Sequence, residues 1–386
     1  MHPHHHHSHH HPSRRGFVAS LLAGWAGATL AEISFVRAAS ARAQSATAPR
    51  RLFNIEKVTA GVYSCVARPA ALINCNATIF EQSSHLVVVD THSKASAAAS
   101  LIAQIRREVS EKPVRYIINT HFHWDHAQGA SAYRKAFSPL DVIACETTRV
   151  AIESETEKRI KIQVENDVPP FIEEARKKQS DARTSAEKDF YGDQISQLEA
   201  YRREMGSFEL VVPSITFEKV FVLEDSEREL HLSFQGRAHT AGDVVVLSPR
   251  DHLLATGDLI HGFFPYIGDG YPREWPSTID KVAALDFRSI LPGHGPVQTG
   301  RDRMANFRAY VEELTERVST GMRKGQSVVE LKKSITAASL RSLKTDDYGD
   351  FLSANNKKYR PNFGDPPPLQ DSINLNIEHL HQRLDV

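Results

Sequence analysis

The chain has 386 residues, of which 41% are hydrophobic and 24% are charged, with ordinary numbers of glycine and proline. This composition excludes collagen-like, low-complexity and wholly disordered chains, and the length allows one large domain with additions or two modest domains. Lys plus Arg equals Asp plus Glu at 47 each, so nothing indicates a nucleic-acid or membrane-surface partner.

The first 43 residues have the layout of an export signal. Met1–Pro12 holds eight of the 20 histidines and is typical of an expression tag or of a natural metal-binding tract. Residues 13–18, Ser-Arg-Arg-Gly-Phe-Val, resemble a twin-arginine signal, and a mildly apolar stretch and a small-residue exit at 41–43 follow. We therefore expect a protein that is periplasmic or secreted.

A transmembrane anchor is the alternative for this segment. Three glycines, two serines and Glu32 within residues 16–36 make the stretch too polar to favour it, so we expect no stable membrane insertion after processing. Removal of residues 1–43 leaves 343 residues with 43 basic and 46 acidic side chains.

The three cysteines are too few and too scattered for a disulfide scaffold or a zinc ribbon. Export permits a bridge between Cys65 and Cys75. We favour buried free thiols for these two and for Cys145.

Short strand-like runs begin the mature chain. The apolar patterns predict strands at Val58–Val66, Ala77–Phe80, His85–Asp90 and Val114–Asn119, with a helix at Ser93–Val109. This order of strand, helix and strand begins an α/β arrangement.

Residues 151–206 differ from the segments on either side. Ten of the 17 positions from 173 to 189 are charged, with pairs spaced four residues apart as on a helix. An intermittent apolar stripe follows, which predicts a helical insertion that packs against the core or over its mouth. The charges themselves are typical of a solvated face.

Strand-like sequence patterns follow the insertion, and helical patterns end the chain. We expect strands at Ser214–Leu223, Glu229–Phe234, Asp243–Ser248, His252–Thr256 and Ser289–Leu291, and a helix at Thr278–Leu285. A helical pattern runs from Arg301 to Leu343, with a break around Gly321 and Gly325. A link at Pro361–Pro368 precedes a last predicted helix at Leu369–Leu384.

The strongest chemical signal is the run from His121 to His126, which reads His-Phe-His-Trp-Asp-His and directly follows a predicted strand. On an extended segment His121 and His123 point to the same side. Three imidazoles and one carboxylate within six residues are costly to bury unless something pairs them, and this donor set suits zinc, iron or manganese.

Three other candidates lie where a predicted strand runs out into a loop. They are His239 in a Gly-Arg-Ala-His-Thr-Ala-Gly-Asp turn, Asp258 in Thr-Gly-Asp, and His294 in Pro-Gly-His-Gly-Pro. Each alone is more often a simple turn. Together they are typical of a site that the end of a sheet gathers from distant sequence.

In this order the motifs H-x-H-x-D-H, H-T-x-G-D, G-D and G-H-G resemble the metallo-β-lactamase-fold hydrolase superfamily, over roughly residues 52–300. The resemblance implies an α/β fold of the αββα sandwich type and a dinuclear metal centre. It implies one metal on His121, His123 and His239, a second on Asp125, His126 and His294, with Asp258 as the bridge and Asp90 supporting the metal loop.

The resemblance also implies a division of the chain. Residues 44–300 form the catalytic domain with its insertion at 151–206, and residues 301–386 form a helical extension. The best-known β-lactam-hydrolysing subgroup has cysteine where Asp258 stands, so the chain is more similar to glyoxalase-II-type thioesterases and lactonases. Its helical additions resemble alkyl-sulfatase-like and quinoprotein-associated metallohydrolases.

The expected function is that of an exported hydrolase with two divalent ions, most simply zinc, with iron or manganese as the other choices. A metal-bound hydroxide would attack an ester, thioester, lactone or lactam. Asp125 is the candidate for orienting this nucleophile and relaying a proton. The alternatives are an iron-dependent oxidoreductase that oxidises sulfur or persulfide, and a non-catalytic metal-binding or ligand-binding protein.

The expected partner is a small-molecule substrate, not a nucleic acid, and an oligomer remains open. Trp124 and the segment 261–266 are candidates for an aromatic wall. His261 is a candidate substrate contact, although a solvent-facing loop histidine is the simpler interpretation. Arg237, beside His239, is a candidate for binding an anionic group.

Overall fold

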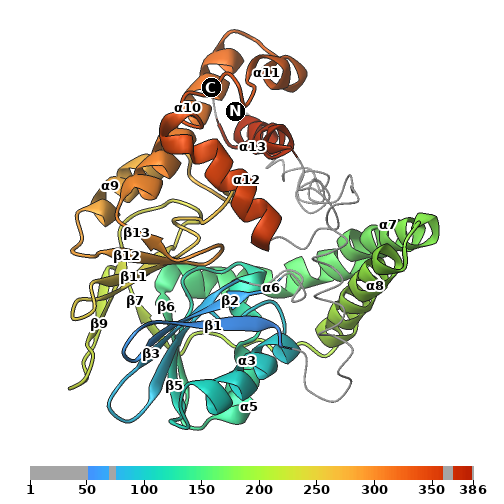
Figure 1. Cartoon of the computed structure of the whole chain (residues 1–386). Helices are drawn as coiled ribbons and strands as arrows, with labels where there is room; N and C mark the ends of the chain where they lie inside the picture. Colours follow the sequence, from blue (N-terminus) through green and yellow to red (C-terminus); the bar gives the residue numbers. More distant parts are fainter. Residues whose placement is uncertain (1–50, 69–74, 360–367, 385–386) are drawn as a thin grey trace, which may run out of the picture.

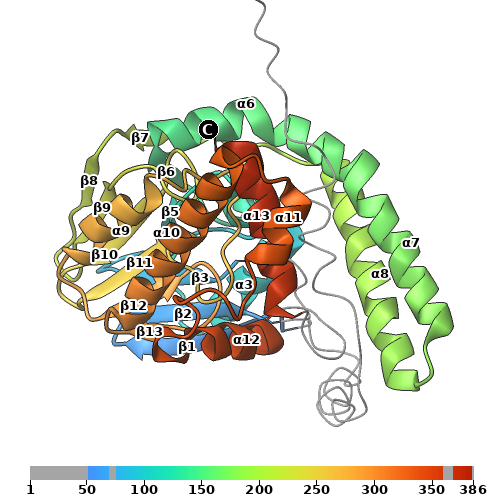
Figure 2. The same cartoon turned by 90° about the horizontal axis from the view of Figure 1, so that it is seen from above.

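The computed structural model describes residues 51–68, 75–359 and 368–384. The expected signal segment and most of the expected link at Pro361–Pro368 lie outside these residues. The described chain forms the αββα sandwich that the family resemblance implies: two β-sheets face each other, and helices cover both outer faces (Figures 1 and 2).

The first sheet has seven strands in chain order. They are β1 (Phe53–Thr59), β2 (Val62–Ala67), β3 (Ala77–Glu81), β4 (Leu86–Val89), β5 (Val114–Ile118), β6 (Asp141–Cys145) and β7 (Ile215–Phe217). The pairs from β1 to β4 are antiparallel and those from β4 to β7 are parallel. Helices α3 (Ala95–Glu108) and α5 (Ala130–Ala136) pack on its outer face through Leu101, Ile105 and Tyr133.

The second sheet has six strands in reverse chain order. They are β13 (Gln298–Thr299), β12 (Ser289–Pro292), β11 (Leu253–Gly257), β10 (Val244–Ser248), β9 (Leu230–Phe234) and β8 (Val220–Leu223). Only β11 and β12 pair in parallel. Every residue of β10 and β11 is buried because side chains from the first sheet cover one face and helices cover the other.

The helical layer over this sheet combines one helix that precedes residue 301 with the helical C-terminal part that the sequence predicts. Its helices are α9 (Trp275–Ala283), α10 (Asp302–Arg323), α11 (Val328–Ser334), α12 (Tyr348–Tyr359) and α13 (Leu369–Arg383). They share one apolar core with the strands beneath, in which Phe307, Leu314 and Ile377 have no exposed surface.

The insertion is helical as expected but begins earlier, at Glu146. It consists of α6 (Glu146–Ile162), a π-helical turn (Gln163–Asp167), α7 (Val168–Asp181) and α8 (Ser185–Met205). The hairpin of α7 and α8 extends away from the sandwich (Figures 1 and 2). Its base packs around Trp124 through Phe171, Leu198 and Tyr201.

Two strand predictions are wrong in detail. The expected strand at Val58–Val66 is a hairpin, because Gly61 adopts a φ of +71° and turns the chain between β1 and β2. The expected strand at Ser214–Leu223 is two strands in different sheets, since the chain crosses between the layers after β7.

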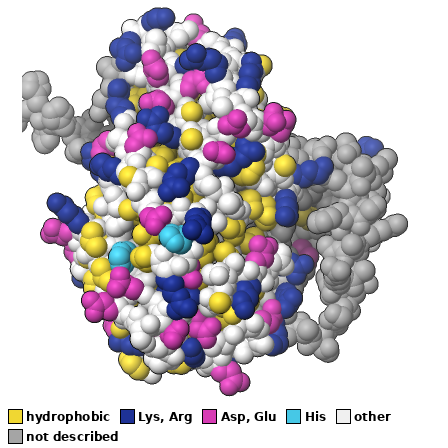
Figure 3. All heavy atoms as spheres, turned by 60° about the vertical axis from the view of Figure 1, so that its left-hand side comes forward, with side chains coloured by type: hydrophobic (Ala, Val, Ile, Leu, Met, Phe, Trp, Pro, Cys, Tyr) yellow, Lys and Arg dark blue, Asp and Glu magenta, His cyan; other side chains and the backbone are white. Residues whose placement is uncertain are grey.

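The outer surface agrees with the balanced charge of the sequence. Figure 3 shows basic and acidic side chains interspersed over one face of the molecule. Among the described residues, none of the helices combines the length and the apolar character that a membrane crossing requires.

Candidate metal centre

Side chains that follow four strands meet at one end of the sandwich. The segment after β5 carries His121 and His123, the loop after β9 carries His239, and β11 and β12 lead directly to Asp258 and His294. The four strands come from both sheets, so the site forms only when the sandwich closes.

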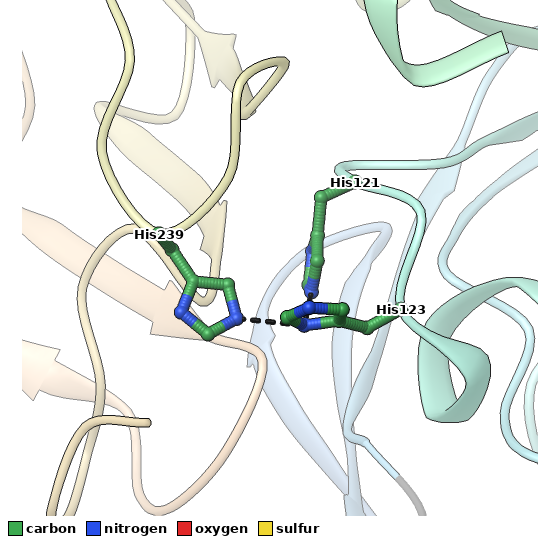
Figure 4. Close-up of side chains that lie close together, drawn as sticks. All are labelled: His121, His123 and His239. Carbon is green, nitrogen blue, oxygen red and sulfur yellow. Dashed lines mark hydrogen bonds between the residues drawn. The ribbon is translucent and has the colours of Figure 1, made fainter. Parts of the chain in front are cut away.

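The first group consists of His121, His123 and His239 (Figure 4). Nδ1 of His123 lies 3.1 Å from Nε2 of His121 and 2.9 Å from Nε2 of His239. All three side chains are buried, with at most 9% of their surface exposed. Three ring nitrogens therefore share one enclosed point.

The opposite ring nitrogens fix where the protons are. His239 Nδ1 lies 3.1 Å from the carbonyl oxygen of Tyr266, and His123 Nε2 lies 3.0 Å from the carboxylate of Asp269, so each must donate there. The Thr120 hydroxyl donates to Asp90 and therefore accepts from His121 Nδ1 at 3.0 Å.

Three lone pairs consequently face one another in the first group. Burial, followed by the neighbouring imidazoles, lowers the pKa values of His121 and His239 well below the usual range, so both rings are neutral. Neutral imidazole lone pairs that converge at this distance repel each other unless a cation lies between them. This is the donor arrangement that a divalent metal requires.

The second group consists of Asp125, His126 and His294. His294 Nε2 lies 3.1 Å from Asp125 Oδ2 and 3.3 Å from His126 Nε2. Asp125 and His126 belong to the short helix α4 (Trp124–Ala127), which begins directly after His123. The helix thus turns Asp125 and His126 toward His294.

Asp258 lies between the two groups. Its Oδ2 is 3.5 Å from Nε2 of His239 and 3.5 Å from Nε2 of His294, and its Oδ1 is 3.4 Å from Nε2 of His126. Oδ1 is buried and accepts no hydrogen bond from the described residues. A buried carboxylate oxygen without a donor is costly, and a bound cation would satisfy it.

The carboxylates give the second group a negative environment. Burial disfavours a charge on His126, but the carboxylates of Asp258, Asp125 and Asp90 raise its pKa well above the usual value. Burial likewise opposes ionisation of Asp125, yet His126 and His294 lower its pKa to about 2. This part of the site therefore favours positive charge. His126 would release its proton when a metal binds.

Asp90 supports the metal loop as the resemblance implies. Its Oδ1 accepts from the backbone N–H of Thr120 at 2.9 Å, and its Oδ2 accepts from His126 Nδ1 at 2.8 Å. Asn76 performs the same task for the His294 loop, because its Nδ2 donates to the carbonyls of Pro292 and Gly295. No sequence pattern pointed to Asn76, which reads as an ordinary loop residue.

Close packing explains why Gly293, and no larger residue, precedes His294. A Cβ at this position would lie 2.4 Å from Asp258 Oδ1 and 2.8 Å from the ring of His126. Any side chain would therefore displace a member of the site.

The candidate substrate contacts have mixed outcomes. The interpretation of His261 as a solvent-facing residue is wrong, because it is 4% exposed and its Nε2 lies 3.5 Å from Asp258 Oδ2. The Arg237 guanidinium pairs with Glu274 and lies 4.4 Å from the centre of the Tyr271 ring instead of joining the converging groups.

The aromatic candidates lie beside the site. Trp124 packs edge-on against Tyr201 of the insertion at a centroid distance of 5.4 Å. The Phe263 ring lies 5.4 Å from the ring of His294, and the Tyr266 ring lies 5.8 Å from that of His123. Apolar rings thus border both groups.

A family model described as the metallo-beta-lactamase superfamily matches residues 71–294, a range that contains every converging side chain. The linear primary-alkylsulfatase of Pseudomonas sp. (strain ATCC 19151) is 24% identical over 265 residues, which cover 65% of this chain and 48% of that protein. The chain therefore spans about half the length of this relative. A metallo-beta-lactamase from Pontibacter korlensis matches with a TM-score of 0.48 and 17% identity, over 67% of this chain and 99% of that chain.

Proposed function

The chain belongs to the metallo-beta-lactamase superfamily, and from this premise we propose that it is a dinuclear metal-dependent hydrolase that cleaves an ester, thioester, lactone or lactam bond. The observation that carries the proposal is the position of Asp258 between two separate groups of donors: its Oδ2 lies 3.5 Å from His239 of the first group and 3.5 Å from His294 of the second, and its Oδ1 lies 3.4 Å from His126. A binding protein for one ion has no need of a second group and a shared carboxylate.

The donor sets fit two divalent ions. His121, His123 and His239 would hold one, Asp125, His126 and His294 would hold the other, and Asp258 would bridge them. Zinc suits imidazole and carboxylate donors, as do iron and manganese. Bound there, the pair supplies Lewis acidity and lowers the pKa of a water to about 7, which provides a nucleophile at neutral pH.

Residues of the chain would orient the water, transfer its proton and bind the substrate. The Asp125 carboxylate is 11% exposed, so it borders solvent and can orient the attacking water and pass its proton to the leaving group. Phe263 and Tyr266 border the two groups with apolar ring surface, which favours a substrate that has an apolar portion next to the scissile bond.

A hydrolysis screen tests this function. Protein that has been stripped with a chelator and reloaded with zinc, manganese or iron(II) is assayed against thioester, lactone, carboxylic ester, β-lactam and primary alkyl sulfate probes. The last probe is included because the alkylsulfatase relative is named for that substrate. We expect turnover on at least one acyl class, only after reloading.

Matched histidine variants make the screen specific. His239→Ala removes a donor from the first group and should abolish turnover, whereas His231→Ala alters an exposed histidine paired with Glu229 and should leave it unchanged. No turnover on any probe by a fully loaded protein would contradict the hydrolase. Oxygen-dependent oxidation of a persulfide by the iron form would support the oxidoreductase instead.

Export is part of the proposal. The twin-arginine pattern at Arg14 and Arg15 would deliver a folded, metal-loaded enzyme to the periplasm or the medium. Replacing both by lysine should retain the protein in the cytoplasm, as cell fractionation would show. Unchanged export of this variant would contradict the proposed route.

A further inference from the structure

Asp269 is a carboxylate with 15% of its side chain exposed that three separate parts of the chain contact. It lies in the loop between β11 and α9. Its Oδ2 accepts from His123 Nε2 at 3.0 Å and from Arg159 Nη1 at 3.1 Å. Its Oδ1 accepts from Arg159 Nη2 at 3.2 Å and from Arg383 Nη2 at 3.1 Å. Arg159 belongs to α6 of the insertion and Arg383 is the last residue of α13.

The two arginines hold this carboxylate in a fixed place. Arg159 pairs with both oxygens through Nη1 and Nη2, and its central guanidinium carbon lies 4.8 Å from the centre of the Phe122 ring. Arg383 also donates from Nε to the carbonyl oxygen of Gly268. Both the position and the orientation of Asp269 are therefore set by helices outside the sandwich.

The orientation of Asp269 decides which nitrogen of His123 faces the metal centre. A carboxylate can only accept, so the His123 proton must lie on Nε2 and the lone pair on Nδ1. Nδ1 is the atom that meets His121 and His239. Outer carboxylates of this kind fix the tautomer and the ring plane of a metal-binding histidine.

A second contact reaches the same group from the same helix. His379 of α13 packs edge-on against Tyr266 at a centroid distance of 4.9 Å. The carbonyl oxygen of Tyr266 accepts from His239 Nδ1 at 3.1 Å. Helix α13 thus stands behind two of the three histidines.

We propose that Asp269 is a positioning residue through which the insertion and the C-terminal helix become parts of the metal centre, with Arg159 and Arg383 holding it against His123. The inference rests on the proposed metal centre. It assigns the helical additions a role in metal affinity that is independent of which substrate the enzyme cleaves.

Zinc affinity of the full-length protein tests the inference. Asp269→Asn keeps the size of the side chain and removes its charge, while Arg159→Gln and Arg383→Gln each remove one holding contact. Arg308→Gln is the matched control, because Arg308 pairs in the same way with Asp280 between α10 and α9, away from the converging groups. Chelator competition measures the dissociation constant of each ion, and the visible spectrum of the cobalt form reports the coordination of the first group.

In Asp269→Asn we expect the dissociation constant of one ion to rise about 10- to 100-fold and that of the other to stay unchanged. The cobalt spectrum should change with it. Arg159→Gln and Arg383→Gln should weaken the same ion by a smaller factor, and Arg308→Gln should match the wild type. If Asp269→Asn does not fold, as circular dichroism would show, the two arginine variants carry the test.

The failures of the inference and of the proposed function differ. If the wild type binds two ions, and Asp269→Asn and both arginine variants bind them as tightly as Arg308→Gln does, the positioning role is wrong. The proposed hydrolase function is then unaffected. If the wild type binds no ions, both are wrong. Weakened binding in Asp269→Asn with unchanged binding in both arginine variants would overturn the role of the helices.

Discussion

In the proposed function, one side chain, that of Asp125, has two tasks. It belongs to the second donor group and borders solvent, so its loss should remove both a metal donor and the proton relay. We predict that Asp125→Ala lowers kcat by at least about 100-fold, the lower end of what a positioned proton-transfer group contributes. Steady-state assays at saturating metal measure this. Near-normal turnover by a variant with both ions bound would rule out Asp125 in this role.

The three cysteines, unlike Asp125, lie away from solvent. Cys65, Cys75 and Cys145 are free and buried, which confirms the free-thiol interpretation over a bridge between Cys65 and Cys75. Burial raises the pKa of all three thiols, that of Cys75 to about 12, so none forms a thiolate at neutral pH.

We therefore predict that the native protein has no fast-reacting thiol. A chromogenic disulfide reagent should release almost no product from the native protein at pH 7.5 and three equivalents after denaturation. One rapid equivalent from the native protein would contradict the burial of these side chains.

At the residue scale the sequence predicted the groups that converge and the supporting Asp90, but it missed Asn76 and Asp269, which also hold them. His121, Asp258 and His294 stand in motifs where a strand gives way to a loop, and the structure brings them together. Asp269 stands in a Gly-Asp-Gly turn whose composition has an ordinary explanation. Its partners Arg159 and Arg383 are remote in sequence, so no local pattern could connect the three.

At the scale of elements, Arg228 joins the two sheets. It lies in the connection between β8 and β9 and is 4% exposed. Its guanidinium pairs with Asp251 at 2.6 Å and donates to the carbonyls of Ala60 and Glu81 in the first sheet. This one buried side chain satisfies acceptors from both layers.

We predict that Arg228→Ala destabilises the protein by about 3–5 kcal/mol, because it leaves Asp251 buried without its cation. The midpoint of urea unfolding, measured with metal in excess, checks this. Arg250→Ala is the control, since Arg250 and Glu227 form an exposed pair worth about 0–1 kcal/mol. Equal midpoints for the two variants would show that Arg228 does not tie the sheets together.

Strands with long apolar runs were predicted well, and elements with a weaker pattern were not. β4, β10 and β11 are buried on both faces, so their text is almost continuously apolar. β6 and α12 were missed because neither has a clear period in the sequence. The split between β7 and β8 depends on which sheet each edge strand joins, and this is a property of the assembled sandwich.

At the scale of the whole molecule, the helical additions are more than appendages. The insertion packs on Trp124 through its base, and α13 shares the core of α10 and stands behind the first donor group. The sequence predicted that both additions are helical, but not that they contact Asp269 and Tyr266, the residues that accept hydrogen bonds from His123 and His239. Such contacts depend on tertiary packing, which no local pattern in one amino-acid sequence reveals.

The number of ions per chain tests the central claim most directly. Protein purified from its own compartment, without added metal, is analysed for zinc, manganese and iron and quantified by amino-acid analysis. Two donor groups joined by Asp258 predict close to two divalent ions per chain, falling to about one in His239→Ala. About one iron per chain in the wild type, with no second ion taken up on addition of metal, would contradict the dinuclear hydrolase.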